Sequence, residues 1–211
     1  KSSDLTVKSM EESPRTERPK PPFTTSTMQQ DAGSRLGWGA QITMRVAQRL
    51  YENGYITYMR TDSINLSQQA ITAARNAAKA LYGADHVADA PRVYQGKTKN
   101  AQEAHEAIRP AGDTFKTPGE LAPELSRDEF ALYDLIWKRT VASQMADAKK
   151  MQMRVDFDAT TNDGKKTIFR ANGSVITFPG FLAAYDDIVT DENKDEESED
   201  KRLPAMTLGQ S

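Results

Sequence analysis

The sequence contains no cysteine and only two histidines, His86 and His105. The absence of cysteine excludes disulfide scaffolds, thiol nucleophiles and cysteine-ligated zinc, and it is compatible with a reducing cytoplasm. Two histidines are too few for a histidine-rich metal centre. Any chemistry of this sequence must therefore come from other side chains.

Long apolar runs are also absent. No stretch of about 18 apolar residues occurs, and the first residues, KSSDLTVKSMEE, have neither the apolar core of a signal peptide nor a small-residue cleavage site. We therefore expect no segment that enters a membrane. Hydrophobic residues make up 37% of the 211 residues and charged residues 27%, a balance typical of a globular protein.

The net charge of -2 is distributed unevenly along the chain. Residues 20–150 carry 17 basic and 14 acidic groups, whereas residues 151–211 carry 7 and 12. Much of the acidity lies in DENKDEESED, residues 191–200, which predicts a solvated, mobile loop over about 191–202. The small basic excess of the middle segment permits phosphate binding but does not by itself argue for it.

The middle of the chain carries apolar residues at helical spacing. Residues 40–52 show this pattern and end at Asn53-Gly54, a pair that tolerates positive φ. The alanine-rich residues 68–82 follow a candidate capping residue, Ser67. The predicted helical segments are 27–35, 40–52, 68–82, one or two turns within 103–108, and a helix from Ser126 towards Met145.

Both ends of the chain show the alternation of β-strands. The predicted strands are 5–10, 151–157, 167–170, 175–178 and a last one over 203–210, with a hairpin turn at Asn162-Asp163-Gly164. The predicted fold is α+β and multidomain, with a mainly helical, helix-turn-helix-like domain inserted into an antiparallel β domain. The expected boundaries are 1–19 and 151–211 for the two parts of the β domain and 20–150 for the helical domain.

The segment YITYMRTDSINLS, residues 55–67, contains a candidate nucleophile. A tyrosine hydroxyl has an ordinary pKa of about 10, so it attacks at neutral pH only where a cation or base favours the phenolate. In an extended segment alternate side chains share a face, so Ile56, Tyr58 and Arg60 would project together. A guanidinium can hold a phosphate through two hydrogen bonds. Tyr58 and Arg60 therefore suit attack on a phosphodiester, although Tyr-x-Arg is also common on structural strands.

A second polar cluster, QEAHEAIRP, occupies residues 102–110. It is not a zinc-protease helix, because Arg109 stands where the second histidine would follow His105. It also lacks the His-x-x-Arg spacing of tyrosine recombinases, in which the tyrosine follows the histidine rather than preceding it. His105 is either a hydrogen-bonded structural histidine or a second cation near a phosphate.

Three stretches together closely resemble the type IA DNA topoisomerases. They are PPFTTSTMQQDAGSRLGWG at 21–39, AQRLYENGYITYMRTDSINLS at 47–67 and QEAHEAIRP at 102–110, in this order. The resemblance is strong over residues 20–145 and looser over the flanking β segments. Three long motifs in the right order are far more specific than a lone Tyr-x-Arg.

The resemblance implies roles for individual residues. Tyr58 would be the nucleophile that forms a 5′-phosphotyrosine link during transient single-strand cleavage, strand passage and religation. Arg60 would position the tyrosine and the phosphate, and His105 would assist cleavage. Arg60, His105 and Arg109 are the predicted DNA contacts. For Glu106 and Arg109, which both match the motif, bracing of the site is the alternative role.

The resemblance also implies an architecture and partners. The helical domain would sit in a β-rich arch, and single-stranded DNA at the cleavage site would be the ligand of a monomeric, cytoplasmic, nucleoid-associated enzyme. No metal ligand is predicted in this sequence, because the Mg²⁺-binding TOPRIM domain of the family has no equivalent here. A fragment without that domain is expected to be inactive in relaxation of negatively supercoiled DNA.

Two other functions fit parts of the sequence. A non-catalytic helical DNA-binding module is the first, but the segment 68–82 offers only Arg75 and Lys79 as cations for a recognition helix. A purely structural arch fragment is the second, and it requires Tyr58 to be buried.

Overall fold

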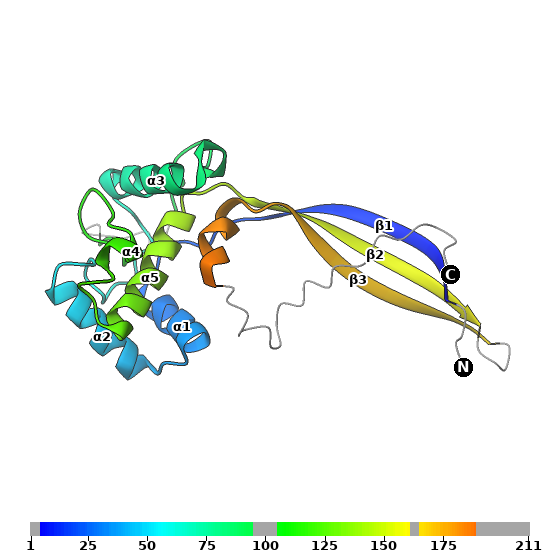
Figure 1. Cartoon of the computed structure of the whole chain (residues 1–211), viewed down its shortest axis with the longest axis horizontal. Coiled ribbons are helices and arrows are strands. Elements are labelled where there is room, and N and C mark those ends of the chain that lie inside the picture. The colour runs from blue at the N-terminus through cyan, green and yellow to red at the C-terminus, as the bar shows by residue number, and fades with distance from the viewer. Residues whose placement is uncertain (1–4, 95–104, 161–164, 189–211) are drawn as a thin grey trace. The chain divides into compact units, whose positions relative to one another are not determined.

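A computed structural model of the chain describes residues 5–94, 105–160 and 165–188 (Figure 1). The predicted hairpin turn at 162–164, the acidic loop at 191–202 and the last strand at 203–210 lie outside the described residues. Contacts divide the chain into two compact units. The first contains the strands, and the second contains residues 18–146 together with 180–186.

The first unit is a three-stranded antiparallel sheet in the order β1-β2-β3. Its strands are β1 (Leu5–Glu17), β2 (Ala148–Thr160) and β3 (Lys166–Phe178), seen side by side in Figure 1. The predicted strands over 167–170 and 175–178 are one continuous strand, because Asn172 and Gly173 stay paired with β2. β1 extends beyond the predicted Met10 and tolerates Pro14, since an edge strand has a side without ladder hydrogen bonds.

Side chains alternate across β2 as the sequence pattern requires. Val155 is fully buried, whereas its neighbour Asp156 accepts hydrogen bonds of 2.7 and 2.9 Å from Arg170 on β3. These bonds lower the pKa of the Asp156 carboxyl. The sheet is therefore held by apolar contacts on one face and cross-strand ion pairs on the other.

The second unit is helical, and four of its five described α-helices confirm predicted ones. They are α1 (Thr25–Leu36), α2 (Ala40–Glu52), α3 (Gln68–Tyr82), α4 (Pro118–Leu121) and α5 (Arg127–Ala142). Ser67 caps α3 as predicted, accepting a hydrogen bond from the Ala70 amide. Gly54 follows α2 with φ of 76°, the left-handed conformation that glycine adopts without strain.

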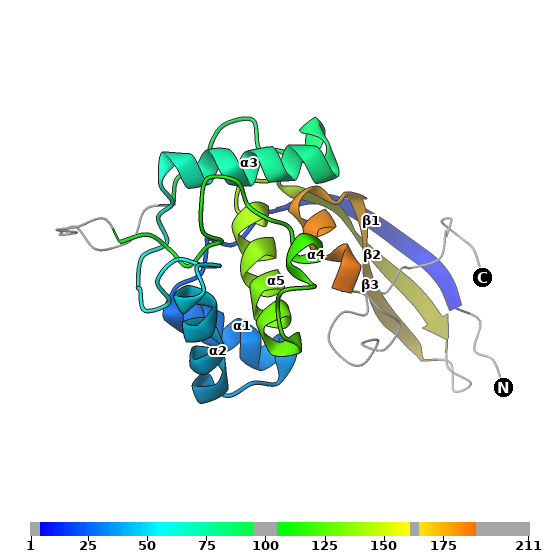
Figure 2. The same ribbon diagram turned by 60° about the vertical axis from the view of Figure 1, so that its left-hand side comes forward.

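Helix α5 forms the centre of this unit and packs against α1, α2, α3 and α4 (Figure 2). Ser126 and Glu129 form a capping box at its start, and its apolar side chains then point in nearly every direction. Trp137, Tyr133 and Ile136 are among the largest fully buried side chains. A helix that is apolar over most of its circumference is stable only when other elements surround it.

Three segments differ from the sequence prediction. The described part of 103–108 is extended rather than helical, because Ile108 pairs with Phe23 in an isolated β-bridge. Helix α4 was not predicted, although Thr117-Pro118 and Glu120 carry a capping box with proline at the first helical position. Residues 180–186, assigned from sequence to the β domain, group with the helical unit.

The segment 180–186 begins a 3₁₀ helix, η2 (Gly180–Ile188). The Phe181 amide donates a 2.9 Å hydrogen bond to the Ala146 carbonyl, and the Arg35 guanidinium lies 5.1 Å from the centroid of the Tyr185 ring. Burial raises the pKa of Tyr185 to about 12. These contacts attach the segment to helix α1 and to the end of the central helical region.

Candidate active site

Tyr58 and Arg60 both project outward from an extended segment. Tyr58 is 49% exposed and Arg60 is exposed, whereas Met59 between them is buried. The alternation predicted for this pair is therefore present. Ile56 does not share their face, because it pairs with Pro110 in an isolated bridge and is buried.

The neighbouring tyrosines are engaged in different ways. The rings of Tyr51 and Tyr58 meet edge to face, with 5.2 Å between their centroids. The Tyr55 hydroxyl instead donates a 3.0 Å hydrogen bond to the Glu124 carboxylate. That hydrogen bond is the main reason why the pKa of Tyr55 is raised, which disfavours its phenolate. Of Tyr55 and Tyr58, Tyr58 is the better candidate for a nucleophile.

Arg60 and His105 line a common pocket of about 600 Å³, although they are 45 positions apart in the sequence. Tyr58 is not among the residues that line it. The remaining lining is polar and lies partly at the start of α1, where helix amides and the positive end of the helix dipole favour anions. The other lining residues are Thr24, Thr25, Ser26, Thr61 and Asp62.

Thr25 joins the start of α1 to the segment that carries Tyr58. Its hydroxyl donates a 2.8 Å hydrogen bond to the Met59 carbonyl and accepts one of 2.9 Å from the Thr61 amide. Its own amide donates to the Thr61 carbonyl over 2.9 Å. In the sequence, Thr24 and Thr25 stand just before the predicted helix over 27–35. The contact of Thr25 with residues 59–61 had no signal in either segment alone.

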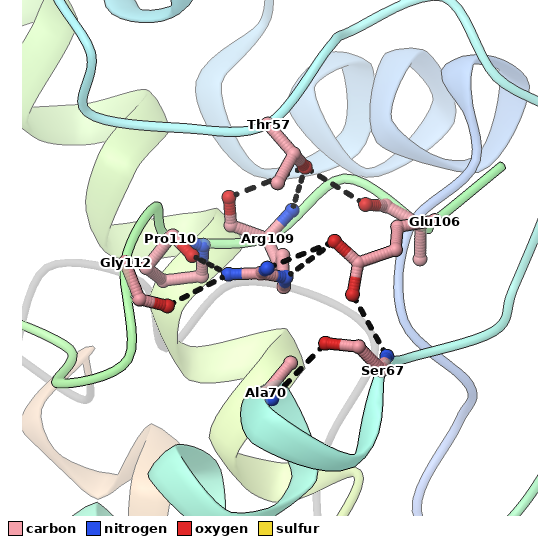
Figure 3. Close-up of polar contacts among 8 residues, drawn as sticks. Thr57, Ser67, Ala70, Glu106, Arg109, Pro110 and Gly112 are labelled. Carbon is pink, nitrogen blue, oxygen red and sulfur yellow. Dashed lines mark hydrogen bonds and ion pairs between the residues drawn. The ribbon is translucent and has the colours of Figure 1, made fainter.

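Thr57 joins the same segment to residues 107–109, which closely follow His105 in the sequence, and Figure 3 shows its contacts with Arg109. The Thr57 amide donates to the Arg109 carbonyl over 2.9 Å, and the Arg109 amide donates to the Thr57 hydroxyl over 3.0 Å. The Thr57 hydroxyl also donates to the Ala107 carbonyl over 2.8 Å. Tyr58 thus directly follows a residue that is hydrogen-bonded to the second polar cluster.

Arg109 points into the fold rather than towards solvent. Only 8% of the Arg109 surface is accessible to solvent. Its guanidinium donates to Glu106 Oε2 through Nε (3.1 Å) and Nη2 (2.8 Å), and to the Pro110 and Gly112 carbonyls through Nη1 (2.8 and 3.1 Å), as Figure 3 shows. This engagement argues against a direct DNA contact by Arg109 and favours a bracing role.

Neither a metal centre nor a membrane-spanning helix is found in the part of the chain that the structure describes. Within those residues, no group of three or more histidine, aspartate or glutamate side chains could hold a metal ion. No described helix combines the length and apolar character needed to cross a membrane.

A family model described as DNA topoisomerase matches residues 1–211. The chain belongs to the DNA topoisomerase family. It is 54% identical over 212 residues to the DNA topoisomerase 1 of Mycolicibacterium smegmatis and 53% identical over 203 residues to that of Streptomyces coelicolor. These alignments cover 99% and 96% of the chain, and 22% and 21% of the respective relatives. The chain thus spans about a fifth of the length of these relatives.

The fold is also similar to a solved topoisomerase. The full-length topoisomerase I of Thermotoga maritima superposes with a TM-score of 0.73 at 34% sequence identity, over 99% of this chain and 32% of that one. Mixed helices and antiparallel sheet are therefore shared with a bacterial topoisomerase I.

Proposed function

We propose that this chain carries the catalytic tyrosine of a type IA DNA topoisomerase. The complete enzyme relaxes negatively supercoiled DNA by cleaving one strand through a 5′-phosphotyrosine link, passing the other strand and religating the break. The observation that carries the proposal is that the Tyr58 side chain is exposed. Arg60, two residues later in the sequence, lines a polar pocket together with His105. This geometry lies in a chain of the DNA topoisomerase family.

The exposed Tyr58 supplies the nucleophile in this mechanism. Its Oη gives up its proton and forms a bond to phosphorus, the bond between phosphorus and the 3′ oxygen breaks, and the 3′ oxygen takes up a proton and leaves as a hydroxyl, so that no net proton is gained or lost. Religation reverses these bond changes. Single-stranded DNA suits the site, because a flexible strand can bring its backbone to an exposed side chain.

Arg60 and His105 provide cationic and hydrogen-bonding groups for the scissile phosphate. The Arg60 guanidinium can donate two hydrogen bonds to phosphate oxygens and offset the charge that develops during displacement. His105 faces the same pocket and supplies a further donor. The hydroxyl groups at the start of α1 suit the adjoining phosphates.

The architecture of the two units supports the same assignment. The helical unit, with Tyr58, takes most of its residues from one continuous stretch between β1 and β2. We assign it to the catalytic-tyrosine domain, inserted between two parts of a β arch. In the complete enzyme we expect a monomer that acts in the cytoplasm on nucleoid DNA.

The Mg²⁺ of the family does not fit the described residues of this chain, which contain no suitable group of three ligands. We therefore assign the ion to a TOPRIM domain in the complete enzyme and derive no catalytic step from it here.

The exposure of Tyr58 disfavours a purely structural role for this chain. A non-catalytic DNA-binding module would need cations on a helix that enters a DNA groove. Arg75, one of the two cations of α3, is half-buried, so α3 is a poor recognition helix.

Replacement of the tyrosine tests the proposal. In a complete topoisomerase that carries this region, Tyr58→Phe should abolish the covalent DNA adduct on denaturing gels and leave binding to a single-stranded oligonucleotide within about twofold of wild type. Tyr51→Phe and Tyr55→Phe are matched controls and should still form the adduct. A persisting adduct in Tyr58→Phe would remove Tyr58 as the nucleophile.

A further inference from the structure

The residues from Tyr58 to Leu66, called here the tyrosine loop, are flanked on both sides by a residue that is hydrogen-bonded to one short segment, residues 106–109. Thr57 precedes the loop and exchanges hydrogen bonds with Arg109 and Ala107. Ser67 follows the loop, and its amide donates a 2.7 Å hydrogen bond to Glu106 Oε1. The segment that begins one residue after His105 therefore sets where the tyrosine loop begins and ends.

Glu106 uses its two carboxylate oxygens for different purposes (Figure 3). Oε1 accepts from the Ser67 amide, and Oε2 accepts from Nε and Nη2 of Arg109. Arg109 is itself held by the Pro110 and Gly112 carbonyls. The carboxylate is consequently fixed by a buried cation that has little freedom to move.

The hydrogen bond to Ser67 completes a helix cap from a distance. In a capping box, a glutamate three residues after the capping residue accepts from the amide of that residue. In α3 this position is Ala70, whose side chain has no hydrogen-bond acceptor. Glu106, 39 residues after Ser67 in the sequence, accepts the hydrogen bond from the Ser67 amide instead. A negative charge at this helix end is also favoured by the helix dipole. The start of α3 therefore depends on a residue next to His105.

We infer that Glu106 is a positioning residue for DNA cleavage, one that holds the Tyr58 loop and the His105 segment in a fixed relation. This inference rests on the proposed function. Glu106 does not line the pocket that contains Arg60 and His105. Its effect on the reaction passes through Ser67 and Arg109. Misplacement of a reacting group by about 1 Å can slow a reaction by about a hundredfold.

Glu106→Gln tests the inference in a complete topoisomerase that carries this region. Glutamine keeps the size of the side chain but removes the charge and turns a donor group towards Ser67 or Arg109. Single-turnover cleavage of a saturating oligonucleotide should slow by roughly ten- to a hundredfold, with oligonucleotide binding within about twofold of wild type. A loss of folded protein alone would lower the fraction cleaved and leave the rate constant unchanged.

Glu129→Gln is the matched control. Glu129 accepts a 2.9 Å hydrogen bond from the Ser126 amide and caps α5 in the same manner, but it is not bonded to the tyrosine loop. Its variant should cleave within about twofold of the wild-type rate. Equal cleavage rate constants for Glu106→Gln and Glu129→Gln would overturn the inference.

A second pair of variants acts on the other partner of the hydrogen bond. Ser67 has φ of -62°, which proline can adopt, so Ser67→Pro removes the amide N–H that donates a hydrogen bond to Glu106. Ser67→Ala keeps that proton and removes only the hydroxyl cap. Ser67→Pro should slow cleavage by at least about tenfold more than Ser67→Ala, and equal rates would contradict the inference.

The Tyr58→Phe variant separates the two hypotheses. If it still forms the adduct, the proposed function fails. If it forms none while Glu106→Gln and Ser67→Pro cleave at control rates, only the role of Glu106 fails.

Discussion

The ring of Tyr58 packs edge to face against the ring of Tyr51, with 64° between the two ring planes. Tyr51 lies in the last turn of α2, so a rigid helix supports an otherwise exposed side chain. An aromatic pair of this kind contributes roughly 0.5–1.5 kcal/mol beyond buried area. The contact restricts the orientations from which Tyr58 can approach a substrate.

Loss of the Tyr51 ring should therefore slow cleavage. In the complete enzyme we expect Tyr51→Ala to reduce the rate of adduct formation by about two- to tenfold, because Tyr58 then samples more rotamers. Tyr51→Phe retains the ring and should stay close to wild type. A similar reduction in Tyr51→Phe would show that the Tyr51 hydroxyl, rather than the ring contact, is responsible.

The 211-residue chain alone should not relax supercoiled DNA in the presence of Mg²⁺. Its described residues offer no group of metal ligands, and the proposed mechanism assigns strand passage to the complete enzyme. An agarose-gel relaxation assay with the purified chain checks this, with the complete enzyme as positive control. Relaxation by the chain, absent from its Tyr58→Phe variant, would contradict the prediction.

Arg139 should be important for stability rather than for cleavage. Its residue exposure is 7%, its Nε donates a 2.6 Å hydrogen bond to the Pro21 carbonyl, and its guanidinium lies 4.6 Å from the centroid of the Phe23 ring. Arg139→Ala should lower the free energy of unfolding by about 2–4 kcal/mol in denaturant titrations. The exposed Arg127 provides the control. Arg127→Ala should change the free energy of unfolding by less than about 0.5 kcal/mol.

Stability should fall in acid partly through Glu106. Burial raises the pKa of this carboxyl, but the hydrogen bonds from Arg109 and Ser67 more than offset burial and leave the pKa below its ordinary value of 4.5. A carboxyl with a lowered pKa stabilises the fold above its unfolded-state pKa and loses that contribution as pH falls through the folded-state value. The difference in unfolding free energy between wild type and Glu106→Gln should be constant above about pH 5.5 and shrink below about pH 4.5. A difference that does not change between pH 6 and pH 3 would contradict this.

Local patterns in the sequence were sufficient for most of the helical unit. Residues 40–52 form α2 as predicted, and Ser67 and Ser126 cap the helices that follow them. Helical periodicity and capping depend on residues within about four positions, so they can be read without knowledge of the fold. The predicted strands 167–170 and 175–178 are both present in β3, but their separation was wrong for the opposite reason, since pairing with β2 carries the strand through Asn172-Gly173.

The sequence by itself also determined the candidate chemistry, because Tyr58 and Arg60 lie in one motif and His105 in another, within a set of three motifs whose residues and order are specific to one family. Tertiary structure alone decided how these residues are supported. Arg109 turned inward to Glu106, residues 105–110 became extended, and Thr25 reached residues 59–61. Each of these outcomes depends either on hydrogen bonds between segments more than 30 residues apart or on burial. The periodicity of a single segment encodes neither long-range hydrogen bonds nor burial.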